Sequence, residues 1–465
     1  MPFEADGDGR KWSLLLGENG CGKSTVLRSI ALLLAGSDAL PELLGDIDAW
    51  ITAGEDRCVL AADLSTARGE PRHISLEIQR GDSIRAVFDR NRETLNELDD
   101  ALVHADRNYF TVGYGVSRRL SADLTATTTP VASPFRTRRA QSVATLFWSD
   151  ATLNPLETWA MDLEYRRGAR GLQTVREALD GLLPGIELAR IDRAQRRMLF
   201  KTADGELPLS ALSDGYQNVA AWVGDLLFRL TETFHDRRHP LDARGLLLID
   251  EIDLHLHSVW KRQLVEFLTS KLPNFQIVAT THSPLTAHQA GPNELFLLRR
   301  DEADGPPHLY QFQGEPRTLM LHQLLMTPIF GVETVDSLKV EQDRARYRAL
   351  QAQEKRTRGE QREFTQLRTE LESLPDWSTE SPSEARQREL LEQIDVALAL
   401  ANGTATNGRR APTSAATPAS ATPASAAPAP RALAARPRRA ASPLPPEPTP
   451  RENLGDGRGA LVRLS

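Results

Sequence analysis

A glycine-rich loop near the start of the sequence has the residue types that bind the phosphates of a nucleotide. The segment from Gly17 to Thr25, GENGCGKST, fills every fixed position of the pattern G-x-x-x-x-G-K-[ST]. In such a loop the backbone N–H groups point into one concavity beside a helix N-terminus, which binds an anion. We expect Lys23 to reach the β- and γ-phosphates of ATP and Ser24 to hold Mg²⁺. The other loop residues expected to line the nucleotide are Gly17, Glu18, Asn19, Gly20, Cys21, Gly22 and Thr25.

Two carboxylates at the end of an apolar run supply the second part of this chemistry. The run Leu246–Ile249 is followed directly by Asp250 and Glu251. A carboxylate that ends a buried strand beside a phosphate loop supports Mg²⁺, so Asp250 is the expected metal residue. Glu251 is one residue further and should point to the other side of the strand, where it can orient and deprotonate the attacking water.

A histidine and the start of a helix are expected to complete the site. His282 follows the next apolar run of the chain and can there hydrogen-bond the γ-phosphate. Ser213 is a good N-cap, and Gly215 lets a ligand approach the backbone, so the helix expected over 218–230 offers a second phosphate site. The structural alternatives are an ordinary capped helix and a histidine that belongs to the surface or the core.

An α/β framework must bring these residues together. The apolar run 12–16 and the periodic apolar residues after the loop predict a strand, the phosphate loop and a helix. The runs 246–249 and 275–279 are continuously apolar, which is typical of strands buried on both faces, and a helix over 258–272 should connect them by a right-handed crossover. We also expect strands over 58–64, 74–78 and 109–116, helical structure over most of 154–183, and a hairpin over 190–200 followed by a turn at Asp204–Gly205.

Composition favours a cytoplasmic protein without a membrane partner. The chain has 465 residues, 40% of them hydrophobic, and a net charge of -7, so any nucleic-acid contact must come from a local patch. Its two cysteines, Cys21 and Cys58, cannot form a disulfide framework and fit a reducing compartment. The sequence has no apolar stretch long enough to span a membrane, and its acidic N-terminus lacks the apolar core of a signal peptide.

The composition also divides the chain into three parts. Residues 1–332 are expected to form the nucleotide-binding head, with a helical and mixed insert at about 91–205. Residues 333–400 carry apolar residues at heptad-like spacing in two groups, 364–374 and 390–398, which predict a short helical hairpin. Residues 401–465 are rich in Ala, Pro, Thr and Ser and carry more arginines than carboxylates, which predicts a disordered tail that serves as a solvated linker or a weak nucleic-acid tether.

Five segments taken together resemble ABC-type ATPases of the SMC/RecF/OLD-like kind. These segments are GENGCGKST at 17–25, YFTVGYGVSRRL at 109–120, LSDGYQN at 212–218, LLLIDEIDLHLH at 246–257 and IVATTHSP at 277–284. The run at 329–347 resembles the C-terminal part of the same group. Over roughly residues 12–400 the chain is similar to the AAA family ATPases of bacterial anti-phage systems such as Septu.

The resemblance implies a fold class and a role for each site residue. The fold would be α/β, a P-loop NTPase with an ABC-type head in which helices flank a mixed sheet. Lys23 would bind the β- and γ-phosphates, and Ser24 and Asp250 would hold and support Mg²⁺. Glu251 would be the catalytic base and His282 the switch histidine.

The same resemblance implies a homodimer that forms with ATP. The LSDG segment would be the signature loop, and Ser213 and Gly215 would complete the nucleotide site of a second copy. Asp253 lies where the D-loop of the family begins. His255 and His257 belong to the "LHLH" stretch typical of the group. Two histidines at this i, i+2 spacing on a strand could ligate a metal, but no third ligand is evident, so we do not expect a metal there.

Two features depart from the family pattern. No glutamine between the phosphate loop and the signature can be assigned as a Mg²⁺ sensor, because Gln79 lacks the context and the 109–120 segment carries Tyr114 and Arg118 instead. Few residues precede Gly17, whereas family members have one or two further strands there. Either the start codon has been assigned too late or the edge of the sheet is incomplete. An unpaired sheet edge favours aggregation.

The leading hypothesis is an ATPase whose ATP-driven dimer acts as a switch on DNA or on an effector protein in anti-phage defence. A RecF/SMC-like DNA-repair ATPase is the alternative, although the interval between Ser24 and Ser213 lacks the sustained heptads of a long coiled-coil arm. A transporter ATPase is less favoured. No E-x-x-x-D followed by D-x-D occurs in 291–341, so a nuclease would be a separate partner. DNA contacts could come from two groups of arginines: Arg136, Arg138 and Arg139, and Arg190, Arg193, Arg196 and Arg197.

Overall fold

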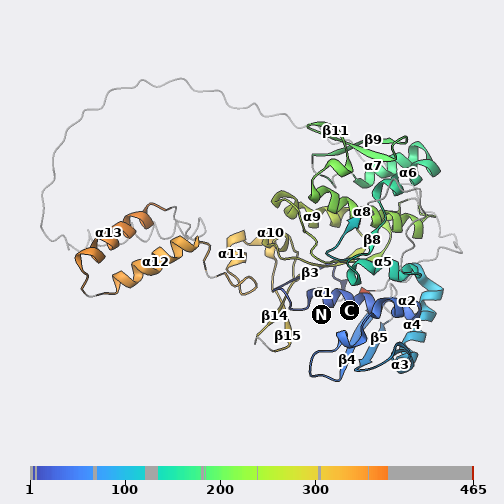
Figure 1. Cartoon of the computed structure of the whole chain (residues 1–465), viewed down its shortest axis with the longest axis horizontal. Helices are drawn as coiled ribbons and strands as arrows, with labels where there is room; N and C mark the ends of the chain where they lie inside the picture. Colours follow the sequence, from blue (N-terminus) through green and yellow to red (C-terminus); the bar gives the residue numbers. More distant parts are fainter. Residues whose placement is uncertain are drawn as a thin grey trace, which may run out of the picture. The chain divides into compact units, whose positions relative to one another are not determined.

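The computed structural model is shown in Figure 1. It describes residues 4–5, 8–65, 71–120, 135–179, 183, 185–237, 239–301, 305–332, 334–353, 355–374 and 463–464. The chain divides into two compact units, residues 1–354 with 458–465, and residues 355–457.

A six-stranded mixed sheet organises the first unit. Its strand order is β15-β14-β3-β13-β12-β6. The bounds are β3 Trp12–Gly17, β6 Thr111–Tyr114, β12 Gly245–Ile249, β13 Phe275–Thr280, β14 Leu295–Arg300 and β15 Pro307–Gln311. All neighbours are parallel except β15, which runs antiparallel to β14. The expected α/β fold class is therefore confirmed.

The strand before the phosphate loop lies inside this sheet. β3 pairs with β13 on one side and with β14 on the other. β3 is therefore not an edge strand, because β14, which sequence order does not place beside it, pairs with its second side. The edges of the sheet are β15 and β6.

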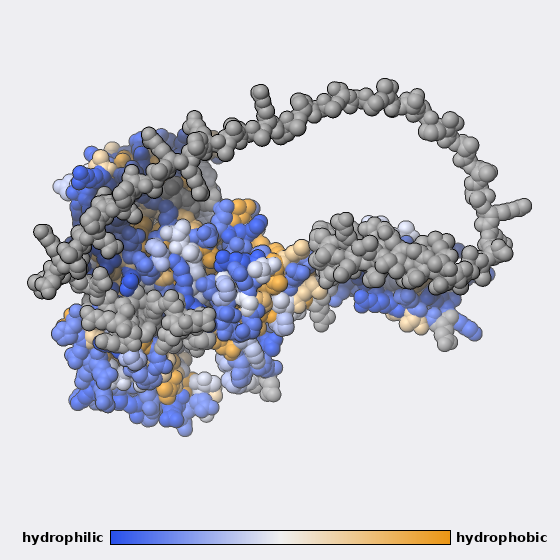
Figure 2. All heavy atoms as spheres, turned by 180° about the vertical axis from the view of Figure 1, so that it is seen from behind, coloured by the Kyte–Doolittle hydropathy of each residue, from blue (hydrophilic) through white to orange (hydrophobic). Residues whose placement is uncertain are grey.

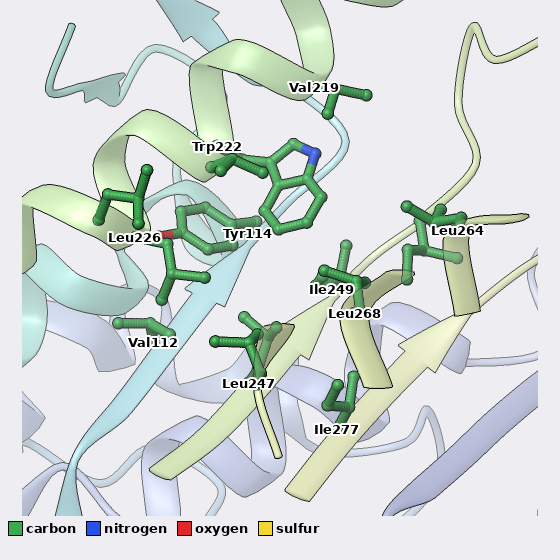
Figure 3. Close-up of a cluster of buried hydrophobic side chains, with 14 of the residues drawn as sticks. Val112, Tyr114, Val219, Trp222, Leu226, Leu247, Ile249, Leu264, Leu268 and Ile277 are labelled. Atoms are coloured by element: carbon green, nitrogen blue, oxygen red, sulfur yellow. The ribbon is translucent and has the colours of Figure 1, made fainter. Parts of the chain in front are cut away.

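Both faces of the central strands are buried, as their continuous apolar sequences predict. On β3, Leu14 and Leu16 join one hydrophobic cluster and Leu15 joins the other, because side chains alternate along a strand. One face is covered by α8, Asp214–Thr233, and α9, Ser258–Lys271, whose side chains meet those of the strands in Figure 3. The opposite cluster contains residues of α1, Lys23–Leu33, α2, Gly36–Leu44, and α5, Arg138–Phe147.

The crossover expected between the two most apolar strands is present. Helix α9 connects β12 to β13, and these strands are parallel neighbours that pair from Gly245–Phe275 to Ile249–Ala279. Figure 3 shows Leu247, Ile249 and Ile277 from these strands facing the side chains of α8 and α9. The strand at 109–116 is shorter than expected, since residues Asp106–Tyr109 form a 3₁₀ turn and only Thr111–Tyr114 pair.

Smaller elements surround the sheet. The expected strands at 58–64 and 74–78 are confirmed as an antiparallel pair, and the expected hairpin at 190–200 is confirmed within a three-stranded sheet. The strand bounds are β4 Arg57–Ser65, β5 Pro71–Gln79, β9 Glu187–Asp192, β10 Arg197–Thr202 and β11 Gly205–Pro208. The helices are α3 Ile84–Arg90, α4 Arg92–Ala105, α6 Leu156–Arg167, α7 Ala169–Leu179 and α10 Pro284–Ala287. Two-residue strands are β1 Glu4–Ala5, β2 Asp8–Gly9, β7 Arg119–Leu120, β8 Thr152–Leu153 and β16 Arg463–Leu464.

The C-terminal helices are α11, Leu321–Leu325, α12, Leu338–Gln351, and α13, Arg358–Glu372. Helix α13 carries most of the first heptad group and begins with a capping box between Thr357 and Glu360. The second heptad group, 390–398, and the tail, 401–465, lie outside the described residues apart from β16. The division at 332 and 400 stays a prediction.

One face of the molecule is largely polar. The face in Figure 2 is mostly hydrophilic, with hydrophobic residues in small separate patches. Among the helices that the structure describes, none has the length and apolar character needed to cross a membrane.

Candidate functional site

Four chain segments converge where parallel strands of the sheet end. Because β3, β13, β12 and β6 are parallel, their carboxyl ends lie side by side along one edge of the sheet. There the chain continues into the phosphate loop after β3, into Thr281–His282 after β13, into Asp250–Glu251 after β12 and into Gly115–Arg118 after β6. In open α/β sheets this edge is where ligands bind.

Backbone conformation shapes the phosphate loop. Gly20 and Gly22 have φ values of 80° and 101°, which favour glycine, and Gly22 is the N-cap of α1. A Cβ on Gly17 would lie 2.3 Å from the Leu298 carbonyl oxygen, so this position accepts only glycine. The loop therefore presents backbone N–H groups at the start of an eleven-residue helix, an arrangement that fits the phosphates of a nucleotide.

Lys23 and Ser24 lie at the start of α1 as expected. The buried Lys23 ammonium group donates hydrogen bonds of 2.8 Å to the carbonyl oxygens of Gly17 and Glu18. The hydroxyl of Ser24 donates a 2.6 Å hydrogen bond to Oδ2 of Asp250. A hydroxyl and a carboxylate oxygen at this separation are hard ligands of the kind that Mg²⁺ prefers, so these two side chains fit the expected metal.

Thr280, the last residue of β13, organises both carboxylates. Its hydroxyl donates to Oδ1 of Asp250 at 2.6 Å and accepts from the backbone N–H of Glu251 at 2.7 Å. Sequence reasoning missed this role, although Thr280 stands in the IVATTHSP segment that it singled out. The missing information was the parallel pairing that sets the end of β13 beside the end of β12.

Glu251 reaches its position by a turn and not by strand alternation. Strand β12 ends at Ile249, and Glu251 has a φ of 45°, so our reason for its direction was wrong. A non-glycine residue in this region costs on the order of 1–3 kcal/mol and is commonly found at functional sites. The turn places Oε1 of Glu251 4.0 Å from Nε2 of His282, and both side chains are partly exposed.

A buried arginine lies against the backbone of both carboxylate residues. The guanidinium of Arg118 donates to the carbonyl oxygens of Gly115 (3.0 Å), Asp250 and Glu251 (2.8 Å), and to Oδ1 of Asn218 at 3.0 Å. Burial lowers the pKa of Arg118 to about 10, although nearby carboxylates oppose the shift, so the group is charged at neutral pH. The sequence had marked Arg118 only as a residue that stands where a glutamine was sought.

The start of α8 packs against the loop that follows Glu251. The helix begins at Asp214, earlier than expected, and Ser213 occupies the N-cap position without a side-chain capping bond. A Cβ on Gly215 would approach the His255 carbonyl oxygen to 2.7 Å. Gly215 therefore allows close packing within the chain. The ring of Tyr216 lies edge-on to Trp260, with centroids 5.1 Å apart.

Asp253 joins the loops that follow β12 and β13. Its buried carboxylate accepts hydrogen bonds from the hydroxyls of Thr281, at 3.0 Å, and Thr286, at 2.7 Å. His257 is the N-cap of α9, with Nδ1 accepting from the backbone N–H of Val259. Within the described residues, no group of three or more His, Cys, Asp or Glu side chains is arranged to hold a metal ion.

Tyr114 is a core residue. Its side chain lies under α8 in Figure 3, and its hydroxyl donates to Oδ2 of the buried Asp225 at 3.0 Å. Burial and the neighbouring Asp225 raise the pKa of Tyr114 well above its ordinary value. Gln79 ends β5 in the separate antiparallel sheet and donates to Glu77. A glutamine equivalent therefore stays unassigned.

Several arginines proposed for DNA contact have partners within the chain. Arg190 pairs with Glu206 and Arg193 with Glu164, each at 3.1 Å. Arg139 donates to the backbone carbonyls of Leu34 and Tyr109. The carboxylates of Glu206 and Glu164 offset the positive charge of Arg190 and Arg193, so the second group offers less charge to a nucleic acid.

Comparisons with known proteins identify relatives of this chain. The family model described as "AAA domain, putative AbiEii toxin, Type IV TA system" matches residues 71–287. The Septu protein PtuA of Bacillus mycoides (strain KBAB4) is 26% identical over 322 residues, which are 69% of this chain and 41% of that protein. The Retron Ec83 probable ATPase of Escherichia coli is 33% identical over 138 residues, which are 30% of this chain and 26% of that protein. The chain thus spans less than half the length of these relatives.

A structural similarity accompanies the sequence relationship. The crystal structure of an Smc head bound to the C-winged helix domain of ScpA is similar with a TM-score of 0.38 and 15% identity, covering 66% of this chain and 92% of that chain.

Proposed function

We propose that this chain, a relative of Septu and retron ATPases, binds ATP with Mg²⁺ and hydrolyses it to ADP and phosphate. The observation that carries the proposal is the 2.6 Å hydrogen bond between Ser24 and Asp250. It joins the phosphate loop to the carboxylate strand at the edge where Glu251 and His282 also lie. This combination of groups is what phosphoryl transfer to water requires.

Each side chain has a defined part in this mechanism. The loop N–H groups and Lys23 bind the phosphates, and Ser24 and Asp250 would hold Mg²⁺, which would supply positive charge to offset that of the phosphates. Glu251 orients the attacking water and accepts its proton. His282, 4.0 Å from Glu251, hydrogen-bonds the phosphoryl group as negative charge moves onto the leaving oxygen.

We further propose that two copies of the chain assemble around ATP. Ser213 is exposed at the N-terminus of the twenty-residue helix α8, and such an end attracts an anion. Ser213 and Gly215 would then complete the nucleotide site of the other copy. The relationship to the Septu protein and the retron ATPases supports a role in anti-phage defence, with DNA or a separate nuclease or effector as the partner.

Phosphate release by the purified full chain tests the activity. The wild-type protein should release phosphate from ATP in the presence of Mg²⁺ and not in the presence of EDTA. The rate per molecule should rise with protein concentration if two copies share a site. Absence of Mg²⁺-dependent release, in a protein that melts cooperatively, would contradict the proposal.

Addition of linear DNA tests the choice of partner. A rise in the ATPase rate, together with retention on DNA that weakens as salt increases, is expected for a DNA-dependent switch. An unchanged rate and no retention at low salt would exclude DNA and leave a protein effector.

A further inference from the structure

The guanidinium of Arg118 connects two parts of the molecule that serve different nucleotide sites in the proposed dimer. One terminal nitrogen donates to the carbonyl oxygens of Asp250 and Glu251, and the other donates to the side chain of Asn218 on α8. Nε donates to Gly115. The side chain is buried, so water does not compete for these bonds.

The backbone of Glu251 is held at both its N–H group and its carbonyl oxygen. The N–H of Glu251 is held by the hydroxyl of Thr280 at 2.7 Å, and its carbonyl oxygen is held by Arg118 at 2.8 Å. Between these two contacts the residue has a φ of 45°, which an unsupported glutamate rarely adopts. Loss of the arginine bonds would therefore release the backbone conformation that sets the position of the carboxylate.

The contact with Asn218 leads to the start of α8. Gly215 lies against the His255 carbonyl, and Tyr216 packs on Trp260, so the first turn of the helix is in direct contact with the segment after Glu251 and with the start of α9. Asn218 is in the second turn of the same helix. A displacement of the helix start by a second copy would reach Glu251 through Asn218 and Arg118.

We propose that Arg118 is a positioning residue that holds Glu251 in its hydrolytic orientation and couples it to the first two turns of α8. The inference rests on the proposed ATPase function. It extends that function by assigning the route through which one nucleotide site senses the helix presented to the other. Arg118 contacts backbone carbonyls and Asn218 and takes no part in proton transfer.

The Arg118→Lys variant tests the inference, because a lysine keeps the charge but lacks the planar fork that reaches both sides. We expect kcat to fall by about tenfold or more while the Kd for a fluorescent ATP analogue changes less than about threefold, since a small misplacement at the reacting groups slows chemistry more than binding. Combined with Glu251→Gln, it should lower the rate no further than Glu251→Gln alone, because both changes act on the same group.

Arg229→Lys is the matched control. Arg229 is a mostly buried arginine on α8, the helix that carries Asn218, but it bonds Asp225, Ser142 and the Gln141 carbonyl. The Arg229→Lys variant should lower the melting temperature about as much as Arg118→Lys, with a smaller effect on kcat. Asn218→Asp, which keeps the acceptor, should preserve more of the rate than Asn218→Ala. Equal losses of kcat in the two arginine variants would show that Arg118 is only structural and would overturn the inference.

Hydrogen–deuterium exchange without nucleotide separates this inference from the proposed function. In Arg118→Lys, exchange should rise together in the peptides that contain 250–256 and 213–219, while Arg229→Lys leaves the first peptide unchanged. Unchanged exchange in both peptides would overturn the coupling. A wild-type protein without ATPase activity would contradict the proposed function, and a joint rise in exchange would still support the physical link.

Discussion

Glu251 and His282 lie 4.0 Å apart, measured from Oε1 to Nε2, although they follow different strands of the sheet. Their separation is set by the parallel pairing of β12 and β13, in which Ile249 faces Ala279. A carboxylate and an imidazole that meet at this edge can act on the same phosphoryl group.

The Glu251→Gln variant should bind ATP but hydrolyse it slowly. Glutamine keeps the shape of the side chain and cannot accept a proton, so we expect phosphate release to fall by roughly 100-fold or more. The slow turnover should also accumulate an ATP-bound dimer. Size-exclusion chromatography with light scattering, with and without ATP, measures the dimer. Hydrolysis at the wild-type rate would show that Glu251 is not the base.

The Lys23→Ala variant should lose nucleotide binding. Its ammonium group is the buried cation of the phosphate loop, and without it the phosphates have no counter-charge from this loop. Fluorescence titration with an ATP analogue measures the loss. Lys11→Ala is a suitable control, since Lys11 binds the carbonyl oxygens of Thr269 and Leu272 at the end of α9. It should lower the melting temperature and keep the affinity for the analogue.

The Gly215→Ala variant should slow hydrolysis through the packing of α8. The added Cβ would meet the His255 carbonyl oxygen at 2.7 Å, so the helix start must move away from the loop after Glu251. Gly359→Ala in α13 is the matched control, because Gly359 also follows its N-cap by two residues and the nearest atom to a new Cβ lies at 4.0 Å. There alanine should favour the helix by about 0.5–1 kcal/mol. Equal ATPase rates in the two variants would contradict the packing role of Gly215.

The Glu157→Gln variant should raise stability in a pH-dependent way. Burial raises the pKa of the Glu157 carboxyl, which is 5% exposed. The folded state therefore binds the proton more tightly than the unfolded state. As the pH rises from the ordinary pKa of a glutamate to the raised pKa of Glu157, the contribution of this group to stability falls. Glutamine is neutral at every pH and removes the cost of burying a charged carboxylate. The melting temperature of Glu157→Gln should exceed that of the wild type at pH 7.5, and the difference should shrink toward pH 4.5.

The control for this pH series is Glu266→Gln, which changes an exposed carboxylate on α9. Its melting temperature should follow the wild-type curve at every pH. A difference between Glu157→Gln and the wild type that stays constant from pH 4.5 to 7.5 would show that the change acts through packing and not through proton binding.

The sequence alone determined the local parts of this protein. The phosphate loop and its helix depend on neighbours along the chain, because glycine spacing and apolar periodicity fix them within a few turns. The same holds for the buried strands at 246–249 and 275–279 and for the helix between them, all of which the structure confirms.

Only the tertiary structure decided how these parts meet. The pairing of β3 with β14, the bonds of Thr280 to both carboxylates and the contacts of Arg118 join residues far apart in the chain. No local pattern encodes such pairings, since they depend on which strands become neighbours when both faces of the sheet are buried. For the same reason the turn at Glu251 and the close packing of Gly215 on His255 became visible only in the folded chain.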